Sequence, residues 1–124
     1  MPDIIKEVGF DFRWDNKKVW ALDVPVSSMD IKDLLWHFDY PFHWDLGEKY
    51  NLTSKEILDN PEKYKSEYER TLKADLKHPI DVMHYKGRWL IVDGLHRLMK
   101  AYLLGMKEVQ VRKIPEERID EIKI

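Results

Sequence analysis

The feature that most constrains the fold of this sequence is an apolar strand that leads directly into a helix. Residues 89–92 are all apolar, which predicts a buried strand, and Asp93-Gly94 interrupts it. Apolar side chains then recur at helical spacing from Leu95 to Tyr102, and Gly105 is typical of the residue that follows a helix. The result is a tight strand–helix connection, and the rest of the domain must be arranged around it.

Short strands are predicted on both sides of this connection. Residues 80–85 and 88–92 predict a hairpin across a Lys-Gly turn, and residues 109–114 predict a further strand. Residues 10–24 predict an N-terminal hairpin, because apolar and polar residues alternate before the turn signal Asp15-Asn16 and a second apolar run follows it.

Helices are predicted between these strands. Ser27 and Ser28 are favourable N-caps for a helix whose apolar stripe runs over residues 31–38. Another helix begins at Pro61, and four of its apolar side chains share one face that we expect in the core: Tyr64, Tyr68, Leu72 and Leu76. We therefore expect residues 1–124 to form one α+β domain, with helices packed around a small mixed sheet.

Composition excludes several classes of function. The chain has no cysteine, which excludes disulfides, thiolate metal sites and a catalytic thiol. The formal net charge is -2, whereas a protein that binds the DNA backbone usually has a marked basic excess, so DNA is not the favoured partner. The N-terminus lacks the pattern of a signal peptide, and no apolar run approaches the length of a membrane span. We expect a cytoplasmic protein without a membrane partner.

The helix that starts at Leu95 carries two basic side chains, His96 and Arg97, in its first turn. Cations oppose the helix dipole at this end, and the first backbone N–H groups of a helix have no partner within it. A bound anion would reverse this effect, because Gly94 lets it approach the backbone and the cations converge on it. The alternative is an ordinary connection in which Asp93 caps the helix and Arg97 is solvated. Local physics leaves both interpretations open.

Several motifs surround this connection in a particular order. Pro-Ile-x-Val at residues 79–82 is followed by the hairpin, by Gly-x-His-Arg at residues 94–97, and by a later glycine and strand. Upstream, Val24–Ser28 leads into the predicted helix. Together these motifs resemble the ParB/sulfiredoxin superfamily over roughly residues 18–114, and the specific part of the match is residues 78–114.

The resemblance implies a nucleotide site that binds ATP, ADP or CTP with Mg²⁺. In that superfamily the helix opened by Gly-x-His-Arg receives the phosphates. Carried over to this sequence, Gly94 allows close approach, and His96 and Arg97 hold phosphate oxygens, while two serines close the other side. The implied nucleotide-binding residues are Gly94, Leu95, His96, Arg97, Ser27, Ser28 and His78.

The resemblance also implies which activities to expect. Sulfiredoxins need a cysteine at the position of Leu95, so sulfinic acid reduction is excluded. Archaeal free serine kinases place an acidic residue before the motif glycine, which implies Asp93 as a Mg²⁺ ligand or catalytic base. Asp30 is a second candidate carboxylate, or an ordinary first-turn acid. We expect a small phosphotransferase or nucleotide hydrolase; the alternative is a non-catalytic nucleic-acid-associated or protein-interaction module that holds a backbone phosphate.

Residues 36–45 combine five aromatic residues with two histidines and two aspartates. One interpretation is a pocket for an unidentified second substrate, formed by Trp36, His37, Phe42, His43 and Trp44. A second is a metal cluster of His37, His43, Asp45 and Asp39, although the spacing fits no standard ligand motif. The third is that the aromatic rings pack this loop against the sheet.

Overall fold

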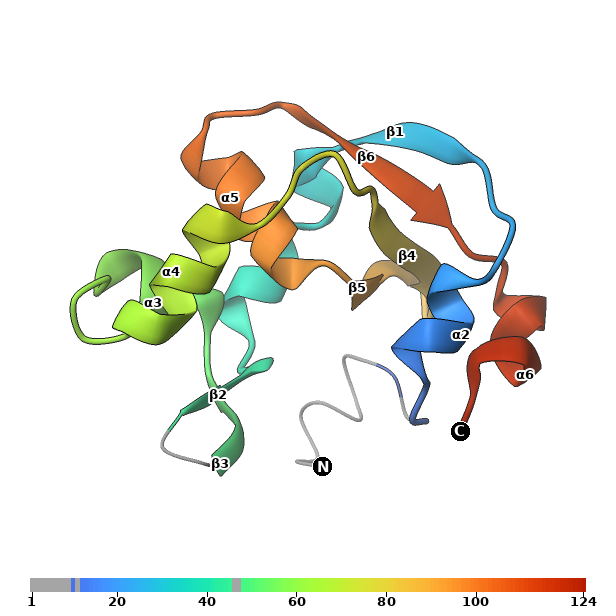
Figure 1. Ribbon diagram of the computed structural model, residues 1–124, viewed down its shortest axis with the longest axis horizontal. Helices are drawn as coiled ribbons and strands as arrows, with labels where there is room; N and C mark the ends of the chain where they lie inside the picture. The colour runs from blue at the N-terminus through green and yellow to red at the C-terminus, as the bar shows by residue number, and fades with distance from the viewer. Residues whose placement is uncertain (1–9, 11, 46–47) are drawn as a thin grey trace.

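The computed structural model describes residue 10, residues 12–45 and residues 48–124, and it has an α+β fold. A four-stranded mixed sheet has the order β1-β6-β4-β5, in which β4 and β6 are parallel and the other neighbours are antiparallel (Figure 1). Its strands are β1 (Val26–Asp30), β4 (Ile80–Tyr85), β5 (Arg88–Asp93) and β6 (Glu108–Lys113). A separate antiparallel pair consists of β2 (His43–Asp45) and β3 (Glu48–Leu52).

Helices flank the sheet at both sides in Figure 1. The α-helices are α2 (Asn16–Trp20), α3 (Ser54–Asp59), α4 (Lys65–Lys73), α5 (Leu95–Leu103) and α6 (Ile119–Ile122). Three 3-10 turns are η1 (Ile31–Asp33), η2 (Leu35–Asp39) and η3 (Glu116–Arg118). Helices α3, α4 and α5 lie to one side of the view, and α2 and α6 lie to the other. None of the helices in the described ranges is long and apolar enough to cross a membrane.

The two faces of the sheet bury different apolar clusters. On β4, Val82 packs into a cluster with Leu98 and Met99 of α5, whereas the adjacent Met83 packs into a cluster with Val19 and Ile122 from α2 and α6. Successive side chains of a strand point to opposite faces, so β4 contributes to both clusters. β4, one of the two inner strands, is therefore covered on both sides, and helix α5 packs on one of them.

The strand–helix connection and its flanking elements are confirmed. β4 and β5 form the expected hairpin, with Tyr85 opposite Arg88. Helix α5 begins at Leu95 and is followed by Gly105, which has a φ of +72°. β6 then lies beside β4, which gives the small mixed sheet that the sequence predicts.

The predicted N-terminal hairpin is wrong. Residues 16–20 form helix α2, because the side chain of Asp15 accepts a hydrogen bond from the backbone N–H of Lys17 and acts as its N-cap. The strand pairing of Trp14 with the described residues is an isolated bridge with Lys123, and residue 11 of the expected strand lies outside the described residues. Aspartate favours both turns and N-caps, which explains the error.

The single helix predicted after Ser28 is also wrong. Ser27 and Ser28 lie within β1 and pair with β6, so they do not cap a helix. Asp30 caps η1 instead, by accepting a hydrogen bond from the N–H of Lys32. The apolar stripe is nevertheless buried at Ile31, Leu34 and Phe38, but on two 3-10 turns. Farther on, Tyr64, Tyr68 and Leu76 pack against the core, whereas Leu72 is 50% exposed.

A buried histidine joins these turns to the sheet. Nδ1 of His37 lies 2.7 Å from the carbonyl oxygen of Leu34, and Nε2 accepts a hydrogen bond from the N–H of Ile91 at 3.1 Å. The ring therefore carries its proton on Nδ1 and is neutral. Burial lowers the pKa of His37 from 6.5 to about 4, and the nearby positive charge of Arg88 adds to this effect.

This histidine should make the fold sensitive to mild acid. Its pKa is lower in the folded than in the unfolded chain, so its contribution is present above pH 6.5 and is lost as the pH falls towards about 4. We expect this residue alone to remove about 2 kcal/mol from the free energy of unfolding between pH 7 and pH 5. Urea unfolding at both pH values checks this.

His37→Gln should lower stability at pH 7 and flatten the pH dependence, whereas the exposed His84→Gln should do neither. An unchanged pH dependence in His37→Gln would contradict the assignment.

Candidate functional site

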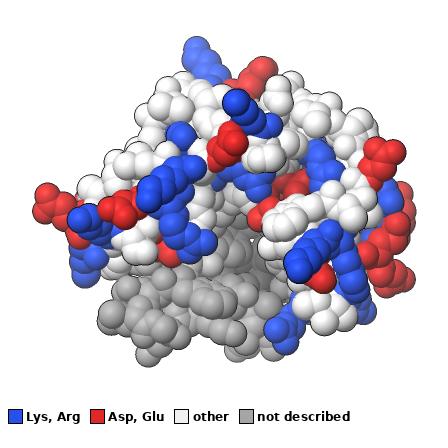
Figure 2. Space-filling view, in the orientation of Figure 1, with Lys and Arg blue, Asp and Glu red and all other residues white. Residues whose placement is uncertain are grey.

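A large cleft opens beside the start of α5. Its volume is about 1180 Å³, which is enough for a cofactor-sized ligand. Figure 2 shows a hollow in this face of the molecule, with basic and acidic side chains around it. The charged residues that line the cleft are Arg70, Lys73, Arg97, Arg112, Asp75, Asp81 and Asp93.

The first turn of α5 forms part of the cleft wall. Gly94 is the N-cap with a φ of +116°, and Leu95, His96 and Arg97 follow it along the wall. Among the described residues no side chain caps this helix, and its first turn contains no acidic residue. The unpaired N–H groups and the positive end of the helix dipole therefore have no counter-charge from a capping side chain.

Arg97 folds back over the beginning of its own helix. Its Nη2 lies 3.0 Å from Oδ2 of Asp93, and its Nη1 donates a hydrogen bond to the carbonyl oxygen of Pro79. The same Asp93 oxygen accepts a hydrogen bond from the Trp20 indole at 2.8 Å. Asp93 therefore does not cap the helix and Arg97, which is 16% exposed, is not solvated. The ordinary connection considered from the sequence is wrong.

Gly94 is required at this position for two reasons. A φ of +116° is strained for any residue with a side chain. In addition, a Cβ atom on Gly94 would lie 3.2 Å from the guanidinium of Arg97. The glycine thus leaves the space that the Arg97 guanidinium occupies at the start of the helix.

A buried ion pair closes another part of the cleft. Nε of Arg112 lies 2.6 Å from Oδ1 of Asp81, and its Nη atoms donate to the carbonyl oxygens of Leu22 and Val19 near the end of α2. Burial raises the pKa of Asp81, although Arg112 opposes the shift. Arg112 is thus committed to holding α2 against the sheet. By contrast, the described part of the chain provides no ion-pair or hydrogen-bond partner for Lys73.

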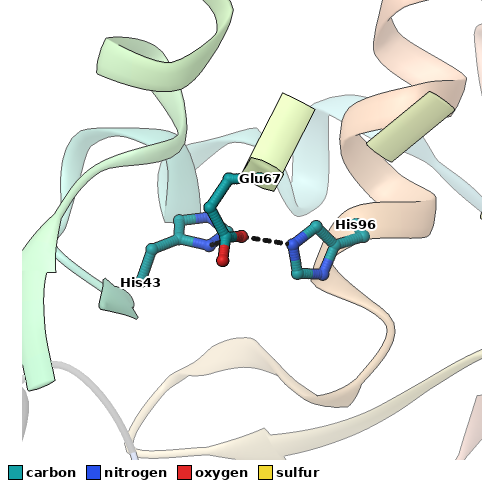
Figure 3. Close-up of side chains that lie close together, drawn as sticks. All are labelled: His43, Glu67 and His96. Carbon is teal, nitrogen blue, oxygen red and sulfur yellow. Dashed lines mark hydrogen bonds and ion pairs between the residues drawn. The ribbon is translucent and has the colours of Figure 1, made fainter. Parts of the chain in front are cut away.

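Three side chains from different elements meet beside the same helix start. Figure 3 shows His43 of β2, Glu67 of α4 and His96 of α5 directed towards one another. Nε2 of His96 lies 2.7 Å from Oε2 of Glu67, and Nδ1 of His43 lies 3.5 Å from the same oxygen. The hydrogen bonds from His43 and His96 lower the pKa of Glu67 to about 2. Burial lowers the pKa of His96, although Glu67 opposes this shift.

The other residues predicted for the nucleotide site are dispersed. The exposed His78 lines the cleft and also a smaller hollow of about 470 Å³, which Ser28 and Arg97 line as well. Ser27 lies on β1 and lines neither space, and Asp30 is also absent from both. Asp30 instead caps η1, so it is neither at the cleft nor the first-turn acid that was its alternative.

Only some residues of the predicted aromatic pocket, residues 36–45, lie at the cleft. His37, Phe42 and His43 line it, whereas the indole of Trp36 donates a hydrogen bond to the carbonyl oxygen of Trp89. Both ring nitrogens of His37 have backbone partners, so the proposed cluster of His37 with His43 is wrong. Asp39 is exposed. The side chains of Trp44 and Asp45 lie outside the described residues.

Sequence reasoning missed several residues of the site. Trp20 lines the cleft but belongs to a segment that the sequence predicts as a strand. Arg70 and Lys73 line the cleft and Glu67 contacts His96 beside it, and all three belong to a helix that the sequence treated as a packing element. Glu67 and Arg70 are three residues apart, a common spacing for a helical ion pair that carries no functional signal. Only the packing of α4 against α5 brings Glu67 to His96.

Comparisons with known proteins do not extend this description. No family model, curated protein or solved structure matches this chain. Its resemblance to the ParB/sulfiredoxin superfamily therefore stays a prediction, and its function is inferred from the geometry of the cleft.

Replacing Gly94 tests whether it leaves space for Arg97. Gly94→Ala and Gly105→Ala both place a side chain at positive φ, which costs about 1–2 kcal/mol at Gly105, near the left-handed helical region, and at least as much at Gly94. At Gly105 an added Cβ meets none of the described residues within 4 Å, but at Gly94 it meets the Arg97 guanidinium. We expect Gly94→Ala to lower the free energy of unfolding by about 1 kcal/mol more than Gly105→Ala, through the disturbed Arg97–Asp93 pair. Equal losses in urea unfolding would show that Arg97 does not depend on this space.

Proposed function

We propose that this chain is a nucleotide-binding domain that holds the phosphates at the start of α5. The observation that carries the proposal is a helix start without an acidic cap, with a fixed guanidinium over it, on the wall of a large cleft. The resemblance of residues 94–97 to the Gly-x-His-Arg motif of the ParB/sulfiredoxin superfamily supports the same function.

Two kinds of donor support phosphate binding at this turn. The first-turn amides bind an anion through their N–H groups and the helix dipole, and Arg97 adds a fixed positive charge beside them. Because Asp93 and Pro79 already hold Arg97, a phosphate would not need to order this side chain. Lys73 lines the same cleft and supplies a cation that no described acid neutralises.

Aromatic side chains in the cleft support binding of the remaining part of a nucleotide. Phe10, Trp14, Trp20 and Phe42 all line it. The Trp20 ring is 59% exposed, and its hydrogen bond to Asp93 fixes it beside the phosphate-binding turn. An exposed and fixed indole offers a surface on which a nucleobase can stack.

The geometry changes the role that we assign to Asp93. Its Oδ2 atom accepts hydrogen bonds from both Arg97 and Trp20. Binding Mg²⁺ or accepting a substrate proton through this oxygen would break both contacts. We therefore assign Oδ2 of Asp93 the positioning of Arg97 and Trp20, which leaves Oδ1, without a hydrogen-bond partner among the described residues, for a contact with Mg²⁺ or a substrate proton. We propose that any Mg²⁺ arrives with the nucleotide phosphates.

Thermal unfolding with added nucleotides tests the proposal. The panel consists of ATP, ADP, CTP and GTP, each with Mg²⁺ and with EDTA, against duplex and single-stranded DNA. A nucleotide at a hundredfold excess over its dissociation constant adds about 2.7 kcal/mol of stability, roughly 10 °C for a domain of this size. A response to DNA without any response to nucleotides would contradict the proposal and favour a nucleic-acid-associated module.

A pair of lysine variants locates the site. Lys73→Ala removes a cation from the cleft, whereas Lys65→Ala removes one from the same helix outside it. We expect Lys73→Ala to weaken nucleotide binding about threefold to fivefold, the size of one exposed charge pair, and to leave stability unchanged. Isothermal titration at two salt concentrations measures this effect. If both variants bind like the parent protein, or weaken equally, the phosphates do not lie in the cleft.

A further inference from the structure

The cluster of His43, Glu67 and His96 offers three metal-ligating atoms at one point. One nitrogen from each histidine and one carboxylate oxygen all lie within 4.8 Å of one another. They come from β2, α4 and α5, so the tertiary fold alone assembles them. Two imidazoles and one carboxylate are a ligand set that proteins use for Zn²⁺ and for Fe²⁺.

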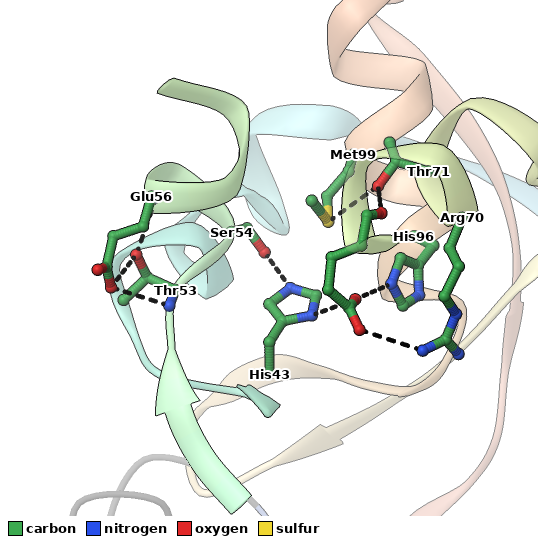
Figure 4. Close-up of polar contacts among 9 residues, drawn as sticks. His43, Thr53, Ser54, Glu56, Arg70, Thr71, His96 and Met99 are labelled. Carbon is green, nitrogen blue, oxygen red and sulfur yellow. Dashed lines mark hydrogen bonds and ion pairs between the residues drawn. The ribbon is translucent and has the colours of Figure 1, made fainter. Parts of the chain in front are cut away.

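Outer contacts already orient two of the three ligands, and Figure 4 shows the one between His43 and Ser54. Nε2 of His43 lies 2.7 Å from Oγ of Ser54, a fully buried side chain on α3. This contact leaves Nδ1 of His43 directed towards Glu67. Oε1 of Glu67 lies 3.2 Å from Arg70, which leaves Oε2 for the two histidines. Metal ligands in proteins are commonly held by such partners, which fix the tautomer and the ring orientation.

Small side-chain movements would fit the cluster to an ion. Donor atoms around a tetrahedral Zn²⁺ lie about 3.4 Å apart, given metal–ligand distances near 2.1 Å. The separation of 3.5 Å between His43 and Glu67 already matches, and the separation of 2.7 Å between His96 and Glu67 needs to open slightly. At present a carboxylate holds these imidazoles by hydrogen bonds, and an ion would replace the protons that they share.

We propose that His43, Glu67 and His96 bind one divalent transition-metal ion of the Zn²⁺ or Fe²⁺ class. His43 would bind through Nδ1, Glu67 through its carboxylate and His96 through Nε2. Both histidines line the cleft, so a three-ligand site leaves a coordination position open on that side. A bound ion adds two positive charges to that of Arg70, whereas Glu67 supplies one negative charge. The net charge at the site is then positive, which favours an anionic group in the open position.

The site goes beyond the proposed nucleotide function and stands without it. Metal binding needs only the three side chains and their outer contacts, whereas phosphate binding needs the amides of the α5 first turn and Arg97. Metal titrations are therefore done without nucleotide, and nucleotide titrations in EDTA are done without a transition metal. Each proposal can fail while the other holds.

Titration of the chelator-treated protein with Zn²⁺ and with Co²⁺ tests the site. We expect one equivalent of Zn²⁺ by isothermal titration, and intense visible absorption of Co²⁺ that is characteristic of four or five ligands. Glu67→Gln and His43→Gln should each weaken binding by at least about 100-fold, and Ser54→Ala about tenfold, because it removes only an outer partner. His78→Gln removes a histidine that lines the cleft outside the cluster and should bind metal like the parent protein.

The metal titrations of the parent protein test the proposed site even if a variant fails to fold. Absence of one-equivalent Zn²⁺ binding, or Co²⁺ absorption as weak as that of the ion in water, would overturn the proposal. So would a full Co²⁺ spectrum in folded Glu67→Gln or His43→Gln, with folding checked by circular dichroism. Loss of binding in His78→Gln but not in His43→Gln would assign the ion to another group of side chains.

Discussion

The side chain of Arg97 connects the strand–helix turn to segments that are distant in the sequence. Its guanidinium holds the end of β5 through Asp93 and the approach to β4 through the carbonyl of Pro79, and it lies over the Gly94 turn of its own helix. Asp93 extends the connection to α2 through Trp20. These contacts fix the direction in which α5 leaves the sheet. The wall of the cleft therefore depends on one ion pair and on the missing side chain of Gly94.

Adjacent residues at the start of α5 leave the helix in different directions. Arg97 turns back towards the sheet, whereas His96 reaches α4 and bonds to Glu67. The phosphate site and the metal site that we propose therefore meet at one helical turn. If both are occupied, the open position of the metal and the amides of the turn face the same cleft, where they can bind different oxygens of one phosphate group. This arrangement replaces the direct contact between His96 and phosphate that the motif alone implies.

Local patterns predicted the second half of the fold, because its turns contain glycines that the backbone requires. Gly87, Gly94 and Gly105 all have positive φ, and they mark the hairpin, the helix start and the helix end. The first half was predicted poorly, because Asp15 is equally suited to a turn and to the N-cap that it forms. The cluster of His43, Glu67 and His96 could not be predicted from the sequence. More than twenty residues separate each of them from the next, and only tertiary packing brings them together.

Amide chemical shifts in the nuclear magnetic resonance spectrum test the central claim most directly. The ¹⁵N-labelled protein is titrated with ADP in EDTA, and the backbone N–H signals of residues 94–97 are followed. A phosphate held by the first turn of α5 should move these signals more than any others and at saturable concentration, together with the side-chain signal of the Trp20 indole. Binding that moves signals elsewhere and leaves residues 94–97 unchanged would contradict a phosphate site at this turn.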